Sequence, residues 1–290
     1  MIRIAVVSGK GGTGKTVVTA ALADLIPGSL VLADCDVDAA NLSLVIPHEM
    51  KSARPYFGMQ CAEIDTETCT GCGACRAYCR FDAIEETENG LKVNPLLCEG
   101  CAVCELVCPE RAVTMKPRMA GEIYASSTSR GPLSHARLFP GAGTSGLLVQ
   151  EVKQAALSSS GEMPLMLIDG PPGIGCPAMA TLSGMDAVII VTEPSISAVH
   201  DLRRLVEVCR GFQVRLFLVI NRADLDPEMT ASIREYCADE NISVLGTIPF
   251  DPAVLSAVRA GKPVTGGSSP AALALCEVRD ALCAALGVTE

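Results

Sequence analysis

Short apolar segments recur along the chain and indicate its fold class. Runs of strand length that are apolar on both faces lie at residues 2–7, 29–34, 164–169, 186–193, 214–220 and 242–250. Segments of helical character lie between and after them, at residues 14–26, 144–158, 196–210, 227–239, 251–260 and 270–286. Strands that are apolar on both faces are typical of parallel sheets covered by helices. The alternation therefore predicts an α/β fold with a doubly wound, mainly parallel sheet.

The alternation stops between residues 52 and 117, which indicates a second domain. Cysteines are dense there, apolar runs are short, and two similar units repeat, with Cys69 matching Cys98. We interpret 52–117 as a small α+β domain inserted into a larger domain made of 1–51 and 118–290. Residues 118–143 are rich in Gly, Ser and Pro, and we expect them to return the chain to the sheet as short strands and a mobile loop.

The composition narrows the class of protein further. Of the 290 residues 49% are apolar and 19% charged, which excludes a disordered chain. No apolar run reaches the roughly 18 residues of a membrane-spanning helix, and the first residues lack the shape of a secretory signal, so we expect a cytoplasmic protein. A net charge of −10 disfavours nucleic acid or anionic lipid as the main partner. In a reducing compartment the 15 cysteines are expected to be thiols or metal ligands.

The segment "GKGGTGKT" at residues 9–16 fits the phosphate-loop pattern GxxxxGK[ST], and it follows a strand and opens a helix. Glycines in such a loop let backbone N–H groups turn toward phosphate oxygens at a helix N-terminus. We expect Lys15 to hold the β- and γ-phosphates and the Thr16 hydroxyl to bind Mg²⁺. The residues expected to surround the nucleotide here are Gly11, Gly12, Thr13, Gly14, Lys15, Thr16 and Val17.

A second lysine, Lys10, makes "KGGTGKT" resemble the deviant Walker A loop of the MinD/Mrp/ParA class of ATPases, which includes the nitrogenase iron protein. The resemblance implies a homodimer with nucleotide at its interface, where Lys10 reaches the nucleotide of the other copy. It also implies an ATPase, with Lys10, Lys15 and Asp36 as its catalytic residues, that is slow unless a partner stimulates it.

Two acidic segments extend this resemblance. "DCDVDAANL" at 34–42 is similar to switch I of the class, which implies that Asp36 orients the attacking water, with a weaker case for Asp38. "LIDGPPGIG" at 167–175 is similar to the Walker B and switch II segment. Because hydrolysis requires a held metal and a held water, we expect Asp34 and Asp169, at the ends of strands, to bind Mg²⁺.

The segment "NRAD" at 221–224 is the candidate for base recognition. The class resemblance implies that Asn221 contacts adenine, with Arg222 beside it and Pro249 of "IPFD" on the other side of the base. The same tetrapeptide resembles the NKxD signature by which GTPases recognise guanine, with Arg222 in the lysine position. ATP is favoured, and GTP remains an alternative.

Two cysteine runs dominate the predicted insert, CxxCxxCxxxC at 69–79 and CxxCxxCxxxCP at 98–109. Such runs hold 4Fe–4S clusters, and the fourth cysteine of each run binds the other cluster. The predicted ligand sets are Cys69, Cys72, Cys75 and Cys108 for one cluster, and Cys98, Cys101, Cys104 and Cys79 for the other. Residues 60–116 resemble bacterial two-cluster ferredoxins, except that Arg80 replaces a proline. Two zinc sites with four cysteines each are the alternative.

One outlying cysteine, Cys176, lies seven residues after Asp169. The nitrogenase iron protein has a cysteine at this offset, which holds a cluster across its dimer interface. Residues 138–146 contain no second cysteine for such a cluster, so ligation by Cys176 is a hypothesis only.

The combination resembles the MinD-superfamily ATPases with an inserted ferredoxin domain, and three functions follow from it. The first is ATP-coupled electron transfer between two 4Fe–4S clusters and a partner metalloprotein. The second is assembly or delivery of a metal cofactor or iron–sulfur cluster. The third is positioning, as in MinD, which the mostly apolar C-terminal helix without a basic face disfavours. The absence of a CxxC pair outside the insert favours the first. The partner and the direction of electron flow do not follow from the sequence.

Overall fold

The computed structural model describes residues 1–143 and 145–288, and the chain divides into two compact units. Unit 1 consists of Met1–Ala53, Ile123–Arg137 and Gly146–Glu290, and unit 2 of Arg54–Glu122 and Leu138–Ser145. The predicted insert, 52–117, therefore ends before the C-terminal boundaries of unit 2, because unit 2 continues to Glu122 and also includes Leu138–Ser145. Segment 138–145, which we assigned to the larger domain, belongs to unit 2, where the Phe139 amide donates to the carbonyl of Ala120 at 2.8 Å.

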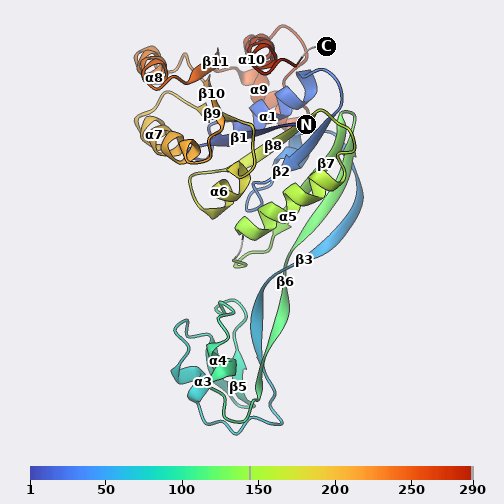
Figure 1. Cartoon of the computed structure of the whole chain (residues 1–290), viewed down its shortest axis with the longest axis vertical. Coiled ribbons are helices and arrows are strands. Elements are labelled where there is room, and N and C mark those ends of the chain that lie inside the picture. Colours follow the sequence, from blue (N-terminus) through green and yellow to red (C-terminus); the bar gives the residue numbers. More distant parts are fainter. Residues whose placement is uncertain (144, 289–290) are drawn as a thin grey trace. The chain divides into compact units, whose positions relative to one another are not determined.

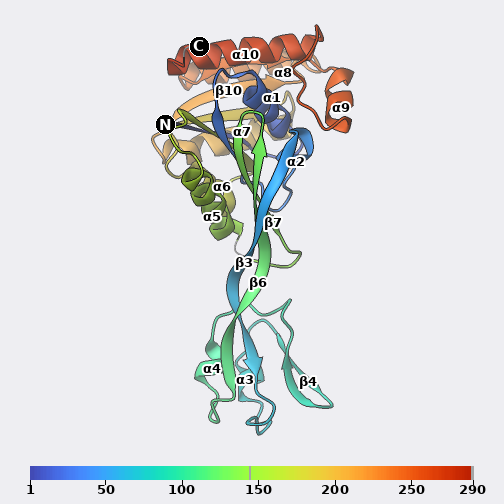
Figure 2. The same cartoon turned by 90° about the vertical axis from the view of Figure 1, so that its right-hand side faces the viewer.

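The sheet of the protein is mainly parallel, as the sequence predicted. Its nine strands have the order β11-β10-β9-β1-β8-β2-β7-β6-β3. The run from β11 to β7 is parallel throughout. The bounds are β1 (Ile2–Ser8), β2 (Leu30–Asp34), β3 (His48–Ile64), β6 (Val113–Thr128), β7 (Gly131–Leu138), β8 (Leu165–Pro172), β9 (Ala187–Thr192), β10 (Arg215–Asn221) and β11 (Ser243–Ile248). Strands β3 and β6 carry the chain from unit 1 into unit 2 and back (Figure 2).

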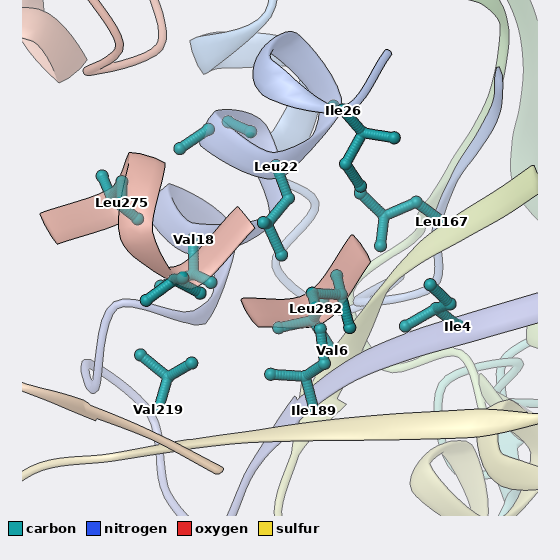
Figure 3. Packing of buried hydrophobic residues seen from close by; sticks show 14 of the residues in the cluster. Ile4, Val6, Val18, Leu22, Ile26, Leu167, Ile189, Val219, Leu275 and Leu282 are labelled. Atoms are coloured by element: carbon teal, nitrogen blue, oxygen red, sulfur yellow. The ribbon is translucent and has the colours of Figure 1, made fainter. Parts of the chain in front are cut away.

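Helices cover both faces of the parallel strands in unit 1. On one face, α1 (Lys15–Leu25) and α10 (Pro270–Leu286) bury Leu22 and Leu275 against the strands (Figure 3). On the other lie α5 (Ser145–Ser158), α6 (Cys176–Leu182) and α7 (Ile196–Arg210) (Figure 1), with α8 (Pro227–Asp239) beside α7. Each fully buried leucine contributes about 1.5–3 kcal/mol by leaving water. No helix in the described part of the chain is long and apolar enough to span a bilayer.

The predicted helices begin close to their predicted positions because local capping fixes their ends. The side chains of Ser195, Asp226, Asp251 and Ser269 each accept a backbone N–H from the first turn of the helix that follows. Proline then occupies the first positions of α8, α9 (Pro252–Arg259) and α10, where its missing N–H costs nothing. Two short helices, α2 (Leu42–Val45) and α6, have no side-chain cap, although α6 has a proline in its first turn, and the sequence did not predict them.

The expectation that residues 118–143 return the chain to the sheet as strands is confirmed, but the expected length of the strands was wrong. Short strands and a mobile loop were expected, whereas β6 is 16 residues long and β7 adds 8 more. The two-residue turn between them is closed by the Thr128 hydroxyl, which accepts the N–H groups of Arg130 and Gly131. Strand β6 has a hydrogen-bonded neighbour on each side, and this tertiary pairing overrides its weak strand composition.

Unit 2 is small and builds its core around cysteines. It contains the hairpin of β4 (Ile84–Thr87) and β5 (Gly90–Val93), the short helices α3 (Ala74–Ala77) and α4 (Val103–Leu106), and the adjoining parts of β3 and β6. Each short helix follows the second cysteine of one run, so the sequence repeat is also a structural repeat. The apolar cluster of unit 2 consists of Ala62, Cys75, Ile84, Leu91, Val93 and Val113, with further cysteines packed against it.

Candidate functional site

The phosphate loop joins β1 to α1, and its backbone requires glycine at two positions. Gly12 and Gly14 have φ of 81° and 93°, the left-handed region that other residues enter at a cost. A Cβ on Gly14 would also lie 2.3 Å from Nδ2 of Asn221. That amide, at the end of β10, donates to the carbonyl of Thr13 at 2.8 Å. In this structure Asn221 therefore braces the phosphate loop.

Charged and hydroxyl side chains from three elements meet behind this loop. Lys15 Nζ lies 2.7 Å from Asp36 Oδ2 and 3.9 Å from Asp169 Oδ1. Burial lowers the pKa of Lys15, but Asp169 and Asp36 outweigh this and raise it, so the ammonium stays charged. The Thr16 hydroxyl donates to Asp169 Oδ2 at 2.7 Å. Burial raises the pKa of the fully buried Asp169, and Lys15 opposes that shift. The sequence predicted this meeting of Lys15, Thr16, Asp36 and Asp169, and the geometry suits a phosphate with Mg²⁺.

Asp34 lies beside this group, but its carboxylate is already engaged. One oxygen accepts the N–H of Asp36 at 3.1 Å, and the other accepts the N–H of Leu42 at 2.9 Å. The side chain is fully buried, and burial, followed by the charge of Asp169, raises its pKa to about 8. In this structure Asp34 shapes the loop that presents Asp36. Magnesium binding by Asp34 stays a prediction, and it requires one of these two contacts to be exchanged.

A cavity of about 560 Å³ opens over the phosphate loop. The predicted residues on its wall are Gly11, Gly12, Gly14, Lys15, Thr16, Val17, Asp36 and Asp38. The sequence analysis did not identify the rest of the wall, which is Ala39, Asn41, Leu44, Val45, Pro171, Pro172, Pro177 and Val258. The two adjacent prolines of "LIDGPPGIG" were a visible signal. Leu44 and Val258 lie outside the quoted motifs, so nothing in the sequence marks them.

Two residues predicted to contact nucleotide point elsewhere in this structure. Lys10 Nζ lies 2.8 Å from Glu193 Oε1 and donates to the hydroxyls of Ser195 and Ser197, each at 3.0 Å. Arg222 donates to the other carboxylate oxygen of Glu193 at 2.9 Å. Glu193 thus forms ion pairs with both Lys10 and Arg222. No motif in the sequence marked Glu193. The nucleotide contacts of Lys10 and Arg222 stay predictions.

The base-recognition segment is folded onto the end of β11. The carboxylate of Asp224 accepts the N–H of Phe250 at 2.6 Å, and the N–H of Ala223 donates to the carbonyl of Ile248 at 3.0 Å. These contacts set Pro249 beside the tetrapeptide 221–224. A base pocket between them stays a prediction. A guanine-reading aspartate needs its carboxylate for the base, and here one oxygen of Asp224 is occupied.

In unit 2 the eight cysteines of the two runs line two separate cavities. One is lined by Cys69, Cys72, Cys75 and Cys108, and the other by Cys79, Cys98, Cys101 and Cys104. Burial raises the pKa of Cys75, and Cys69 and Cys108 add to this rise; burial likewise raises the pKa of Cys104, with Cys98 and Cys101 adding to it, so the same residues group together. The fourth cysteine of each run therefore lies with the first three of the other. Among the described residues, no three His, Cys, Asp or Glu side chains converge on a single metal ion.

Cys176 stands apart from both cysteine sets. It is the exposed first residue of α6, in unit 1, where it packs beside Gly146 of α5. All fifteen cysteines are free thiols.

A glycine loop between strand and helix, with a lysine and a threonine facing carboxylates at strand ends, defines a P-loop nucleotide-binding protein. Residues 4–264 match the family described as the CobQ/CobB/MinD/ParA nucleotide binding domain, and the chain belongs to this family. It is thus a P-loop ATPase of the MinD/ParA type, as the sequence predicted.

Similar proteins agree with this assignment. An uncharacterised protein of Methanocaldococcus jannaschii is 36% identical over 228 residues, which cover 78% of this chain and 80% of that protein. The cell division ATPase MinD of Pyrococcus furiosus has a similar structure, with a TM-score of 0.57, 23% identity and coverage of 97% of this chain and 98% of that one. A Drosophila pseudoobscura protein named as a cytosolic Fe–S cluster assembly factor, a Nubp1 homolog, is 29% identical over 135 residues, covering 40% of this chain and 43% of that protein.

Proposed function

We propose that this protein is an ATP-hydrolysing iron–sulfur protein that holds two 4Fe–4S clusters in unit 2 and couples nucleotide state to electron transfer with a partner metalloprotein. The observation that carries the proposal is the sorting of eight cysteines into two cavities, each with three cysteines from one run and one from the other. A 4Fe–4S cluster takes four thiolates that surround it, with this exchange of the fourth ligand.

The chemistry of the donor set fits these clusters better than it fits zinc. A zinc ion needs four thiolates that meet at about 2.3 Å from one point. Zinc sites usually take their cysteines from separated CxxC pairs, whereas three closely spaced cysteines with a fourth from the other run are the ligand pattern of a 4Fe–4S cluster. When bound, each cluster would accept or donate one electron at this site. The residues that hold it are the two sets of four already named.

At the nucleotide site, the proposed roles follow from the contacts of the phosphate loop. Lys15 is now paired with Asp36 at 2.7 Å. A γ-phosphate gives Lys15 a second anionic partner, which leaves the Asp36 carboxylate to orient a water molecule. Thr16 and Asp169, which are in contact at 2.7 Å, would hold Mg²⁺ together. In this proposal hydrolysis is slow until a partner stimulates it, and ATP is the preferred nucleotide.

We also propose that two copies enclose the nucleotide, with Lys10 reaching the site of the other copy. This requires Lys10 to leave Glu193, Ser195 and Ser197, its present partners. An exchange of this kind is reasonable for a side chain that is 29% exposed, because solvent weakens its present ion pair.

Covalent connections support a coupling between the two units. The switch I segment runs through α2 directly into β3, which carries the chain into unit 2. The last segment of unit 2 leads directly into α5. On α5, Lys153 Nζ donates to the carbonyls of Ala180, Thr181 and Ser183 at 2.6–3.1 Å, and so holds the end of the helix that follows switch II. Switch I is thus connected to unit 2 through α2 and β3, and the helix after switch II is held by α5, which follows the last segment of unit 2.

A second candidate is assembly or delivery of iron–sulfur clusters. It is supported by the similarity over 40% of the chain to a protein named as an Fe–S cluster assembly factor. In that case ATP binding should accelerate loss of a cluster to an acceptor protein.

Anaerobic reconstitution of the full chain tests both functions. We expect iron and sulfide for two clusters, and loss of one cluster in each of the variants Cys72→Ser and Cys101→Ser. Midpoint potentials, followed by electron paramagnetic resonance (EPR), should then differ between the protein with Mg·ATP, with Mg·ADP and without nucleotide. Lys15→Ala should abolish that difference.

Each alternative has its own outcome in these experiments. Zinc without iron in the purified protein would overturn the iron–sulfur proposal. Midpoint potentials that are the same with Mg·ATP, with Mg·ADP and without nucleotide would overturn the coupling to electron transfer. ATP-dependent transfer of a cluster to an apo-ferredoxin, with unchanged potentials, would establish the assembly function instead.

A further inference from the structure

A groove of about 640 Å³ on unit 2 runs along α4 and touches both cysteine sites. The first site is formed by Cys69, Cys72, Cys75 and Cys108, and the second site by Cys79, Cys98, Cys101 and Cys104. The wall of this α4 groove includes Cys101 from the second site and Cys108 from the first. Helix α4 adds Val103, Glu105 and Leu106 to the same wall. A molecule that occupies the α4 groove therefore contacts one cysteine of each site.

Two apolar side chains of α4 face solvent at this groove. Leu106 is 86% exposed and Val103 is 37% exposed. A single exposed leucine is normal on a protein surface. An apolar pair beside a groove with charged residues around it is instead typical of a protein contact site, which has an apolar centre and a polar rim. A surface of this small size suits the brief contacts that electron-transfer partners make.

The corresponding helix of the first run lacks these side chains. The runs "CTGCGACRAYC" and "CEGCAVCELVC" match residue by residue, so that Gly71 corresponds to Gly100. The residues of α3 in the places of Val103, Glu105 and Leu106 are Ala74, Arg76 and Ala77. Arg76 is paired with Glu86 at 3.0 Å. Both runs supply the same set of cysteines, so cluster binding does not explain the apolar and acidic side chains of α4.

The surroundings of the α4 groove are acidic. Glu105 lies on its wall, where a carboxylate oxygen accepts the N–H of Met115 at 3.3 Å. Glu99 lines the cavity of the second site, and Glu110 lines that of the first. Arg111 is the single basic residue that the structure describes on the wall of the groove. Because four thiolates outweigh the charge of an iron–sulfur core, two bound clusters add further negative charge. This charge is complementary to a partner with basic side chains.

We propose that the α4 groove is the docking surface for a redox partner protein whose contact face has an apolar centre and a basic rim. The inference rests on the proposed function, since it requires clusters in the two sites. Leu106 and Val103 form the apolar centre of the contact, and Glu105 attracts the basic rim of the partner. Because electron transfer becomes slower with distance, a contact beside Cys101 and Cys108 favours exchange with either cluster.

Ferric cytochrome c is a suitable probe, because it is a small haem protein with basic side chains around its haem edge. Calorimetry of the oxidised, reconstituted full chain with ferric cytochrome c gives the affinity while no electron moves. Stopped-flow absorbance then gives the rate at which the dithionite-reduced chain, freed of dithionite, passes one electron from a cluster to the ferric haem, which becomes ferrous. Succinylated cytochrome c, whose lysines carry carboxylates, is the matched probe of opposite charge. Affinity and rate should be higher with the unmodified probe, and this difference should shrink as salt is added.

Variants of α4 test the individual side chains, at unchanged iron content. Leu106→Ala should lower the affinity and the rate with cytochrome c about 10-fold. Glu105→Gln, which keeps an acceptor for the N–H of Met115, should lower them about 2- to 5-fold. Glu105→Lys should lower them further and improve both with the succinylated probe. The controls are Leu273→Ala, at a leucine of α10 that is 54% exposed, and Glu88→Gln, in the turn between β4 and β5, and neither should change affinity or rate.

Three outcomes would overturn the proposal. They are equal affinities and rates for the two probes, an effect of Leu106→Ala no larger than that of Leu273→Ala, and a nucleotide-free dimer that Leu106→Ala dissociates in sedimentation. In the last case a second copy of the chain occupies the groove. If Leu106→Ala loses iron, the two Glu105 variants decide the question. A wild-type chain that binds no iron would instead contradict the proposed function itself, so the two failures are distinguishable.

Discussion

Replacing Gly100 by alanine should destabilise unit 2 through a backbone clash that its counterpart Gly71 avoids. Both glycines have a left-handed backbone, with φ of 65° and 71°, so alanine costs about 1–2 kcal/mol at each. Only at Gly100 would the new Cβ also lie 2.4 Å from a backbone oxygen, that of Gln60. Relief of such an overlap requires backbone movement, which costs about 1–3 kcal/mol more. The difference between the two variants therefore isolates the contact between the second cysteine loop and β3.

The assay is anaerobic urea unfolding of the reconstituted chain, with cluster absorbance and far-UV circular dichroism followed together. Gly71→Ala should lower the free energy of unfolding of unit 2 modestly, and Gly100→Ala should lower it by about 1–3 kcal/mol more. EPR should show that Gly100→Ala weakens the signal of the second site first. Equal unfolding midpoints for the two variants, or selective loss of the first cluster in Gly100→Ala, would refute the reasoning.

Three further predictions concern unit 1. The pKa of buried His135 is lowered to about 4, by burial and then by His48, while the unfolded side chain titrates near 6.5. As the pH falls below 6.5, His135 in the unfolded chain therefore takes up a proton before His135 in the folded chain does. The free energy of unfolding should be highest above pH 6.5 and should fall by about 3 kcal/mol as the pH falls toward 4. When thermal stability is measured as a function of pH, its decrease between pH 6.5 and 4 should be smaller in His135→Gln and unchanged in His200→Gln. Asp36→Asn should slow single-turnover ATP hydrolysis at least about 100-fold while ATP still binds; a similar loss in Asp38→Asn would argue against a specific role for Asp36. Asn221→Ala should weaken nucleotide binding by about 1 kcal/mol in calorimetry, because the phosphate loop loses its brace, and unchanged affinity would contradict that role.

Much of the fold could be predicted from the sequence because the signals are local. Strands such as β1 are mostly apolar on both faces, and its residues Ile4, Ala5, Val6 and Val7 are all inaccessible in the structure. Helix starts are marked by capping side chains and prolines within a few residues. The length of strand β6 was not predicted because its stability comes from neighbours on both sides, and its own composition gives a weak signal.

The candidate sites divide in the same way. The phosphate loop and the cysteine runs are recognisable because their ligands lie at fixed spacings within one segment. The spacing also predicted which cysteine of each run joins the other set, and the cavities have this grouping.

The sequence by itself determined the class of sheet, the phosphate loop and the two cysteine sets. In each case the residues that give the signal lie within short segments of the chain. Only the tertiary structure decided that Glu193 holds Lys10 and that Asp34 is engaged by backbone N–H groups. The contacts of Lys10 join residues far apart in the chain. Those of Asp34 depend on how its loop folds, which no local pattern encodes.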